Sequence, residues 1–483
     1  MRSTKRERRA KVAVIGGGVA GSSIALYLGR RGVDVTLFEK KKSLVDGPPM
    51  CHLHAGGNLY REISDAQCLT LLHESIELLR FYPFAIDYRP TVIAVPTDDK
   101  GDPSDLYPRL KMLQESYQKL IDQDPKNAVL GSHDDYYRCY SEAEIRALRA
   151  APDTILHPQT ADEWMTGVAK SIDLSKVKFP LILVQEYGLN MFRIAATATL
   201  ALKALKNVQL MMQSSVSHIL PTDAGWKLRY QEEGRSDEAT FDYLINAAGF
   251  RSGMIDDMIN SRRQRHVEFK SAYVTEWKEH PQTLPEIVFF GERGTPKGMA
   301  QFTPYPDGYF QLHGMTKEIT LFDDGLVQST TESAQPQLDQ KYLDKIDKAW
   351  EKEDALRRSQ SAIDYLSRYI PAFKSARVAS RPLYGAQQIP GDDETLRAAD
   401  VSFEGVRYAR CEIVKASSVL TMADAITQKL MGLGYLSQEA YGKRDYEVMS
   451  KMDEKEIAVL AEQFTQERGY PGSLAHRVKT RGN

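Results

Sequence analysis

Cysteine is scarce in this chain of 483 residues, which contains only four. Cys51, Cys68, Cys139 and Cys411 lie far apart, and no two of them form a C-x-x-C pair. The sequence therefore offers neither the spacing of a zinc site nor the dense pattern of a disulfide scaffold. We expect no bound metal and a core held by apolar packing, for which 42% hydrophobic residues are sufficient.

Long apolar runs and an excess of charge are also missing. No uninterrupted apolar stretch approaches the ~18 residues of a spanning helix, and no apolar segment near the N-terminus precedes a cleavage site. The net charge of −2 does not supply the positive electrostatic potential that nucleic-acid binding requires. We expect a cytoplasmic protein with no nucleic-acid partner and no transmembrane segment, and peripheral contact with a membrane stays open.

The most informative segment that is present runs from Lys11 to Glu39 and reads as strand, glycine turn, helix and second strand. Gly16, Gly18 and Gly21 form G-x-G-x-x-G directly after an apolar strand, where a tight turn needs residues without a Cβ. The helix that follows directs its positive N-terminus at a pyrophosphate. This context predicts a dinucleotide-binding unit.

The predicted dinucleotide-binding unit ends at an acidic residue, Glu39. Glu39 follows the glycines at close to the ~20-residue spacing at which an acid reaches the ribose hydroxyls. A carboxylate there repels a 2′-phosphate and so disfavours NADP. Lys40, the next residue, is included among the predicted cofactor contacts.

Beyond this unit, the β-α alternation stops and later returns. The stretch 100–178 is charged, aromatic and helical, and is interpreted as an insertion or cap. Tyrosine-rich alternating segments between 268 and 321 predict an antiparallel sheet. The other expected elements are helices at Asp65–Phe81, Met191–Leu205, Leu338–Tyr369 and Ser417–Met431, and strands at Thr91–Val95, Val208–Ile219, Phe241–Ala247 and Gly405–Ala409. The long helix leads to a segment at Val378–Leu383.

Four separated segments resemble the D-amino acid oxidase superfamily of FAD-dependent oxidoreductases, nearest its glycerol-3-phosphate and 2-hydroxyglutarate dehydrogenase-like branch. The first is the dinucleotide unit, and the second is HLHAGGNLY at 52–60, which is similar to the loop beneath the flavin ring. The third combines Val216–Ile219 with YLINAAG at 243–249. The fourth begins at Arg381-Pro382 and continues through EIVKASSVLTMADA at 412–425, similar to the closing loop and helix that face the flavin.

This resemblance implies an α/β fold in which a Rossmann-like FAD-binding domain is interrupted by a mainly antiparallel β substrate domain with a helical insertion. The FAD-binding domain would comprise 1–90, 180–262 and 378–440, and the substrate domain 91–179 and 263–377. The tail 441–483 is given no role. The predicted FAD contacts are Gly16, Gly18, Gly21, Glu39, Lys40, His54, Gly56, Gly57, Val216, Ala248, Gly249, Lys415, Ala416, Ser417 and Ser418.

At the closing helix, the physics fits such a role, since a helix N-terminus stabilises the negative charge of a reduced flavin. Ser417 and Ser418 are natural caps for that helix. The family usually has glycines here, so the edge of the flavin would be crowded or unusually charged. His54 occupies a position at which some relatives bond the flavin covalently and others do not, and both readings stay open.

The predicted catalytic residues are His54, His313, Tyr309 and Arg381. An acidic substrate calls for arginine, and Arg381 is the first choice by its place in the motif. His313 and Tyr309 belong to the sheet that would roof the flavin, where His313 could accept a hydroxyl proton near neutral pH. The predicted function is the transfer of a hydride to FAD from a CH–OH or CH–NH carbon of a small anionic substrate.

Several alternatives stay open at this stage. The donor could be a hydroxy acid, a polyol phosphate or an amino acid, and the electron acceptor could be oxygen or a quinone. A flavin monooxygenase is disfavoured because Ala248 stands where that group carries an aspartate. An FAD-binding subunit of a larger redox complex, with 100–178 as its interface, is the other alternative, and an NAD-only protein is the least favoured.

Overall fold

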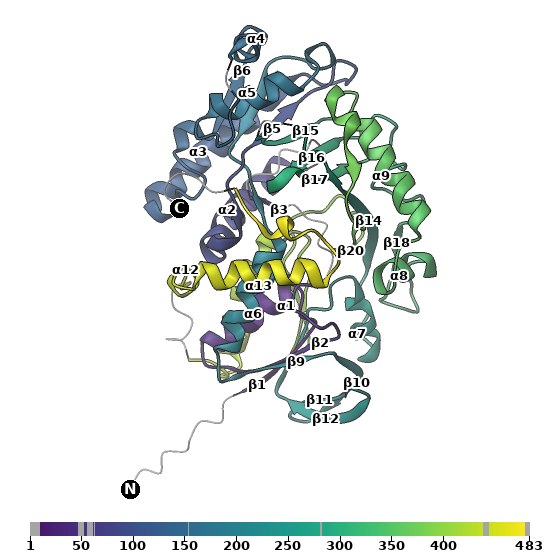
Figure 1. Cartoon of the computed structure of the whole chain (residues 1–483). Helices are drawn as coiled ribbons and strands as arrows, with labels where there is room; N and C mark the ends of the chain where they lie inside the picture. The colour runs from purple at the N-terminus through teal and green to yellow at the C-terminus, as the bar shows by residue number, and fades with distance from the viewer. Residues whose placement is uncertain are drawn as a thin grey trace.

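The structure, a computed structural model, describes residues 10–46, 61, 63–152, 154–280, 283–437 and 444–478, together with the backbone of 53–55. Two sheets dominate it. Figure 1 shows one in the lower half of the molecule, around β1, β2 and β9, and the other in the upper half, around β5 and β15–β17.

The lower layer is a six-stranded sheet of order β21-β22-β13-β1-β2-β9, parallel except for its edge strand β21. Its strands are β1 (Lys11–Ile15), β2 (Asp34–Glu39), β9 (Val208–Met212), β13 (Tyr243–Asn246), β21 (Val401–Glu404) and β22 (Tyr408–Cys411).

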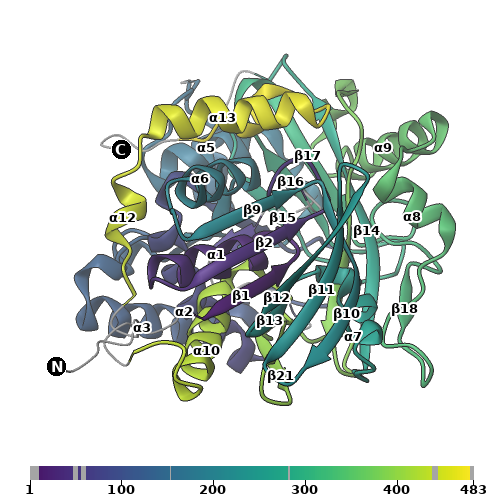
Figure 2. The same ribbon diagram turned by 90° about the horizontal axis from the view of Figure 1, so that it is seen from below.

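Both faces of this sheet are covered, as the apolar run in β1 requires. Val12 and Val14 pack toward α1 (Val19–Arg30), α6 (Met191–Lys203) and α10 (Val419–Gly432). Ala13 and Ile15 point the other way. There they meet the three-stranded meander of β10 (Ser214–Thr222), β11 (Gly225–Glu232) and β12 (Arg235–Phe241), which lies across the parallel strands in Figure 2.

The upper layer is a ten-stranded sheet that is antiparallel except where β5 pairs with β15. Helix α9 (Lys352–Leu366) packs Ala362 and Ile363 against its outer face, and α8 (Gln340–Asp347) precedes α9. The strands are β5 (Thr91–Ala94), β6 (Tyr137–Tyr140), β7 (Leu181–Val184), β14 (Arg265–Glu276), β15 (Glu286–Phe289), β16 (Ala300–Pro304), β17 (Tyr309–Gly314), β18 (Leu326–Gln328), β19 (Arg377–Val378) and β20 (Leu383–Pro390).

The remaining elements connect or flank these layers. A small sheet joins β3 (Leu53–Ala55), β8 (Tyr187–Leu189) and β4 (Ile86–Asp87). The other helices are α2 (Asp65–Phe81), α3 (Tyr107–Gln123), α4 (Glu142–Ala150), α5 (Ala161–Ser171), α7 (Ser252–Met258), α12 (Glu447–Ser450) and α13 (Glu454–Glu467). The α/β fold class expected from the sequence is confirmed.

The C-terminal tail, to which the sequence assigns no role, folds back onto the lower layer. Helix α13, yellow in Figure 1, lies across α6. The Asn190 amide at the start of α6 donates to the carbonyl oxygens of Leu474, at 2.7 Å, and His476, at 3.1 Å. The tail is thereby an integral part of the nucleotide-binding layer.

Two predicted elements differ from the structure. The single strand expected over Val208–Ile219 is broken at Gln213, whose φ of +53° turns the chain from β9 into β10 on the meander. The helix expected over Leu338–Tyr369 is interrupted between α8 and α9, where Lys348 has φ −118° and ψ −90°. The helix predicted over Asp65–Phe81 is confirmed as α2. Strands β7, within 180–262, and β20, within 378–440, join the upper sheet although both ranges are predicted to belong to the FAD-binding domain.

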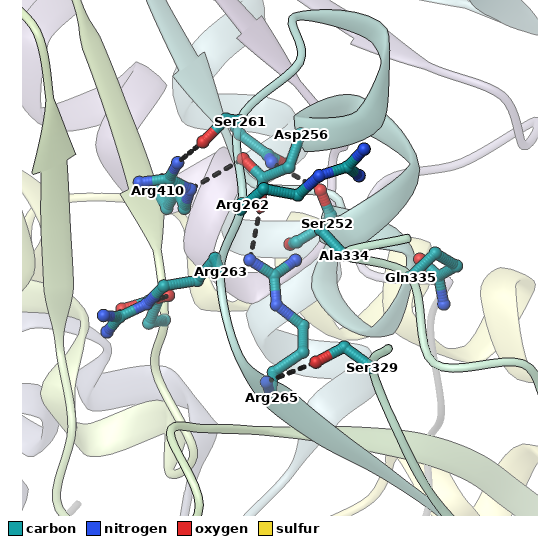
Figure 3. A network of polar contacts seen from close by, with 12 residues as sticks. Ser252, Asp256, Ser261, Arg262, Arg263, Arg265, Ser329, Ala334, Gln335 and Arg410 are labelled. Carbon is teal, nitrogen blue, oxygen red and sulfur yellow. Dashed lines mark hydrogen bonds and ion pairs between the residues drawn. The ribbon is translucent and has the colours of Figure 1, made fainter. Parts of the chain in front are cut away.

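A buried ionic network ties the two layers together (Figure 3). Asp256 on α7 is fully buried and accepts hydrogen bonds from Tyr408 Oη at 2.7 Å and Arg410 Nε at 2.6 Å, both on β22. Its other oxygen pairs with Arg265 on β14, which belongs to the upper sheet. Because charged groups buried in this way depend on one another, the network fixes the position of β14 over the lower layer.

Replacing Asp256 with Asn should destabilise the protein by about 3–5 kcal/mol, because the buried Arg265 guanidinium loses its counter-charge and Arg410 keeps only its pair with Glu404. The midpoint of urea-induced unfolding measures this. Glu292→Gln is the matched control, since Glu292 pairs with Lys100 at 3.2 Å on the surface, where such pairs contribute about 0–1 kcal/mol. Equal shifts for the two variants would contradict the proposed role of the network.

Candidate active site

A cavity of about 870 Å³ lies between the two layers and extends from the glycine turn after β1 to the inner face of the upper sheet. This volume is near the upper end of the ~300–1,000 Å³ typical of small-molecule sites. The predicted cofactor contacts that line the cavity are Gly16, Gly18, Glu39, Lys40, Val216, Ala248, Gly249, Lys415, Ala416 and Ser417.

The glycine turn is shaped by close backbone contacts. Gly16 has φ +102°, and a Cβ built on it would lie 2.4 Å from the carbonyl oxygen of Ala247. A Cβ on Gly21 would lie 1.7 Å from the carbonyl oxygen of Gly16, whereas a Cβ on Gly18 would meet nothing within 4 Å. Gly16 therefore lets the turn lie against the backbone at the end of β13, and Gly21 lets α1 approach the turn. Gly18 leaves its cavity side open for a pyrophosphate.

The carboxylate of Glu39 is fixed at the end of β2 by two backbone groups. It accepts hydrogen bonds from the N–H of Gly17 at 2.6 Å and of Lys41 at 2.7 Å. Beyond it the wall becomes apolar, with Phe38, Val216 and Met254 among its residues. A polar ribose contact beside an apolar slot fits the adenosine half of a dinucleotide.

At the other end of the cavity, the loop before α10 contributes Lys415, Ala416 and Ser417 to the wall. Ser418 is buried away from the cavity, and its hydroxyl donates to Glu74 Oε2 at 2.6 Å. Burial raises the pKa of the Glu74 carboxyl, while the bond from Ser418 opposes that rise.

The expected capping role of Ser417 and Ser418 is wrong. Neither hydroxyl makes a helix-capping bond among the described contacts of this segment. The residues form a 3₁₀ turn that runs directly into α10, and Ser418 itself has φ −74° and ψ 0°. Because a cap needs an extended backbone at that position, this turn removes the geometry for side-chain capping.

The predicted catalytic residues are not all in one place. His313 on β17 lines the cavity, opposite Gln301 of β16. Tyr309 lies on the same strand but outside the cavity wall, with Lys278 Nζ 5.6 Å from its ring centre. Arg381 lines the cavity from an exposed loop, where it donates to Tyr384 Oη at 2.5 Å.

The segment predicted to run beneath the flavin is described only in part. His54 pairs through its backbone with Gly188 of β8. The His54 side chain and the glycines at 56 and 57 lie outside the described residues, so the roles of His54, Gly56 and Gly57 stay predictions.

The structure adds wall residues that the sequence analysis missed. Lys270 of β14 is buried in the cavity wall. The sequence offers little signal for it, since Glu268 and Lys270 alternate with Val267 and Phe269, a pattern also typical of a strand with one exposed face. Arg468 and Tyr470 of the tail also line the cavity, and Arg468 donates to the carbonyl oxygens of Leu44 and Val45 at 3.0 and 3.1 Å. No local sequence pattern predicts that Arg468 and Tyr470 of the tail line the cavity.

An ionic contact crosses the cavity rim between the layers. Asp347, at the end of α8, pairs with Arg251 and with Lys40 at 3.3 Å, and all three residues line the cavity. The neighbouring cations hold the pKa of the Asp347 carboxyl below its usual range, which keeps it charged. The described residues contain no cluster of three or more His, Cys, Asp or Glu side chains suited to a metal ion.

Replacing Gly21 with Ala should weaken FAD binding at least about tenfold, because a Cβ 1.7 Å from the Gly16 carbonyl forces the turn to move. The FAD content of the purified protein, read from its visible absorbance, measures this. Gly432→Ala at the end of α10 is the control, since a Cβ there meets nothing within 4 Å. A Gly21 variant that retains its full flavin would contradict this account.

Replacing Asp347 with Asn should speed FAD dissociation about two- to fivefold, since a partly exposed ion pair contributes about 0–1 kcal/mol. The rate is measured by trapping released FAD in excess apo-flavodoxin. In the wild type the FAD dissociation rate should rise with salt concentration, because salt screens the ion pair. In the variant this rate should depend less on salt. Asp344→Asn, one turn earlier on α8 and paired with exposed Lys348, is the control. Identical rates in the wild type and the Asp347 variant would show that this ionic contact at the rim does not retain FAD.

Solved structures of flavoenzymes share this fold. Glycine oxidase from Geobacillus kaustophilus is 12% identical and has a TM-score of 0.54, covering 88% of this chain and 95% of its own. Glycerol-3-phosphate dehydrogenase from Bacillus halodurans, complexed with FAD, is 12% identical with a TM-score of 0.54, covering 96% and 74%. L-amino acid deaminase from Proteus vulgaris is 15% identical with a TM-score of 0.54, covering 93% and 96%.

A search of curated protein sequences finds no match to this chain. None of the helices in the described part of the chain combines the length and apolarity needed to span a bilayer. The family model for FAD dependent oxidoreductases matches residues 11–398, which include the upper sheet, the lower-sheet strands β1, β2, β9 and β13, and most of the cavity wall. The chain therefore belongs to this family of FAD-dependent oxidoreductases, and FAD is its cofactor.

Proposed function

We propose that the protein oxidises a small anionic substrate at a carbon that bears a hydroxyl or an amine. The observation that carries this proposal is the composition of the wall at the upper sheet. Three adjacent strands of that sheet, β14, β17 and β16, contribute Lys270, His313 and Gln301 to the cavity wall. The same cavity extends to the glycine turn. This composition supports a proton acceptor and a cation beside the space for the cofactor.

Bound FAD supplies the acceptor for the hydride. The protein must then hold the substrate, accept a proton from its hydroxyl or amine, and keep water away. His313 is suited to the proton, since imidazole titrates near neutral pH. Phe290, Met299 and Met315 provide apolar wall around the same region and limit its hydration.

The structurally similar enzymes act on two classes of electron donor, so they do not distinguish an amine from a hydroxyl substrate for this protein. Glycine oxidase and L-amino acid deaminase act on amino acids, and glycerol-3-phosphate dehydrogenase acts on a polyol phosphate. The sequence of the loop at 52–60 favours the hydroxyl donors. We propose a hydroxy acid or polyol phosphate first and an amino acid second.

Anaerobic mixing of the purified flavoprotein with 2-hydroxy acids, glycerol 3-phosphate and amino acids should bleach the flavin with one class only. His313→Gln should slow that bleaching by about 10²- to 10⁴-fold, the usual contribution of a general base. Stopped-flow absorbance measures the rate. His218→Gln, an exposed histidine on the distant β10, is the control.

Two outcomes would change the proposal. If no donor bleaches a fully loaded flavin, the protein acts as an FAD-binding subunit of a larger complex. If the His313 variant bleaches at the wild-type rate, another group takes the proton. Acid precipitation of the same preparation separates the open readings of His54, because covalent flavin stays in the pellet.

A further inference from the structure

We propose that Lys270 and Arg293, held on the single carboxylate of Glu268, form the binding site for the acid group of the substrate. The inference rests on the proposed function and names the residues that select an anionic donor. It assigns to the upper sheet a role that the sequence motif assigns to Arg381.

The three charged groups form one compact cluster. Lys270 Nζ lies 2.7 Å from Glu268 Oε2, and Arg293 contacts the other oxygen, Oε1. Both cations line the cavity, whereas Glu268 is buried behind them. Two cations therefore share one carboxylate, and the cluster presents an excess of one positive charge to the cavity.

Burial makes this excess costly without a ligand. Lys270 is 5% exposed and Glu268 is 4% exposed, so water solvates the pair poorly. Burial lowers the pKa of the Lys270 ammonium, and the charges of Arg397 and Arg293 lower it further, while Glu268 opposes both. Lys270 and Arg293 in turn hold the pKa of the Glu268 carboxyl below its usual range. An anion between the two cations would complete the charge balance of the cluster.

The position of the cluster suits the reaction. Lys270 Nζ donates to Gln387 Oε1 at 3.2 Å, and the Gln387 amide donates to the carbonyl oxygen of Val414 at 2.9 Å. Val414 directly precedes the predicted flavin-facing loop and also lines the cavity. Strand β14 pairs with β17, which carries His313, and with β20, which carries Gln387, so Lys270 stands on the strand between the proposed base and the contact to the cofactor loop.

The guanidinium of Arg381 makes contacts outside this cluster. It donates to Tyr384 Oη at 2.5 Å and lies 5.7 Å from the ring centre of Tyr470 in the tail. Tyr384 in turn donates to the carbonyl oxygen of Ile346 on α8. These contacts join β20, the tail and α8, so Arg381 braces the cavity rim. Arg397 lines the cavity too and donates to the carbonyl oxygens of Glu394 and Leu396.

The shared chemistry of the ligand is an acid group, which a carboxylate or a phosphate could supply. Acetate and inorganic phosphate are therefore titrated separately into the flavin-loaded protein, and binding is followed by the flavin difference spectrum. This readout needs no turnover, so it stands even if no donor reduces the flavin. The anion that perturbs the spectrum at the lower concentration indicates the class of acid group.

Lys270→Met and Arg293→Gln should each raise the dissociation constant of that anion about 10- to 100-fold, as expected for a lost charge-assisted hydrogen bond. Lys278→Met, an exposed lysine paired with Glu276, is the control for loss of one positive charge near β14. With a reducing donor, the concentration for half-maximal bleaching should rise more than the limiting rate falls. Arg293 is one-third exposed, so its variant tests the site if Lys270→Met fails to fold.

Unchanged anion affinity in both variants overturns the proposal. A greater loss of anion affinity in Arg381→Met also overturns it, because Arg381 would then bind the acid group. Bleaching by an anionic donor together with unchanged affinities would leave the proposed function standing and remove only this site. Anion binding that depends on Lys270 and Arg293 without any bleaching would keep the site and reject the oxidation.

Discussion

The two sheets of this protein meet around a space that apolar packing cannot fill, because FAD and a substrate must enter it. The layers are therefore joined at the edges of the cavity by directional contacts. Asp256 binds Arg410 from the lower sheet and Arg265 from the upper one, and Asp347 binds Arg251 and Lys40 at the rim. These charges fix the edges of the active site, alongside an apolar cluster that includes Val14 of the lower sheet and Val274 of the upper one.

Local sequence was sufficient wherever the structure depends on neighbours in the chain. The strand, glycine turn, helix and acid of 11–39 could be predicted because several of their contacts lie inside the unit, such as Gly21 against Gly16 and Glu39 on Gly17. The same holds for α2, whose apolar spacing gives both of its ends. Gln213 was missed because one residue with positive φ redirects a continuous apolar pattern into two different sheets.

The site itself could be predicted only in its cofactor half. The glycines, Glu39 and the loop at 415–417 belong to short motifs, whereas the substrate half is assembled from strands far apart in sequence. Lys270, Gln387 and His313 become neighbours through the pairing of β14 with β20 and β17, which no local pattern encodes. Ser418 illustrates the opposite failure, since a typical capping residue is used here to satisfy the buried carboxyl of Glu74.

The tail that folds back over α6 has a consequence for the order of assembly. Arg468 holds the loop at 43–46, and Tyr470 forms part of the cavity wall, although both follow every other wall residue in the chain. During synthesis, the glycine turn emerges early but faces an incomplete wall until the tail has left the ribosome. The complete wall of the cofactor cavity therefore exists only after the tail has folded back onto the lower layer.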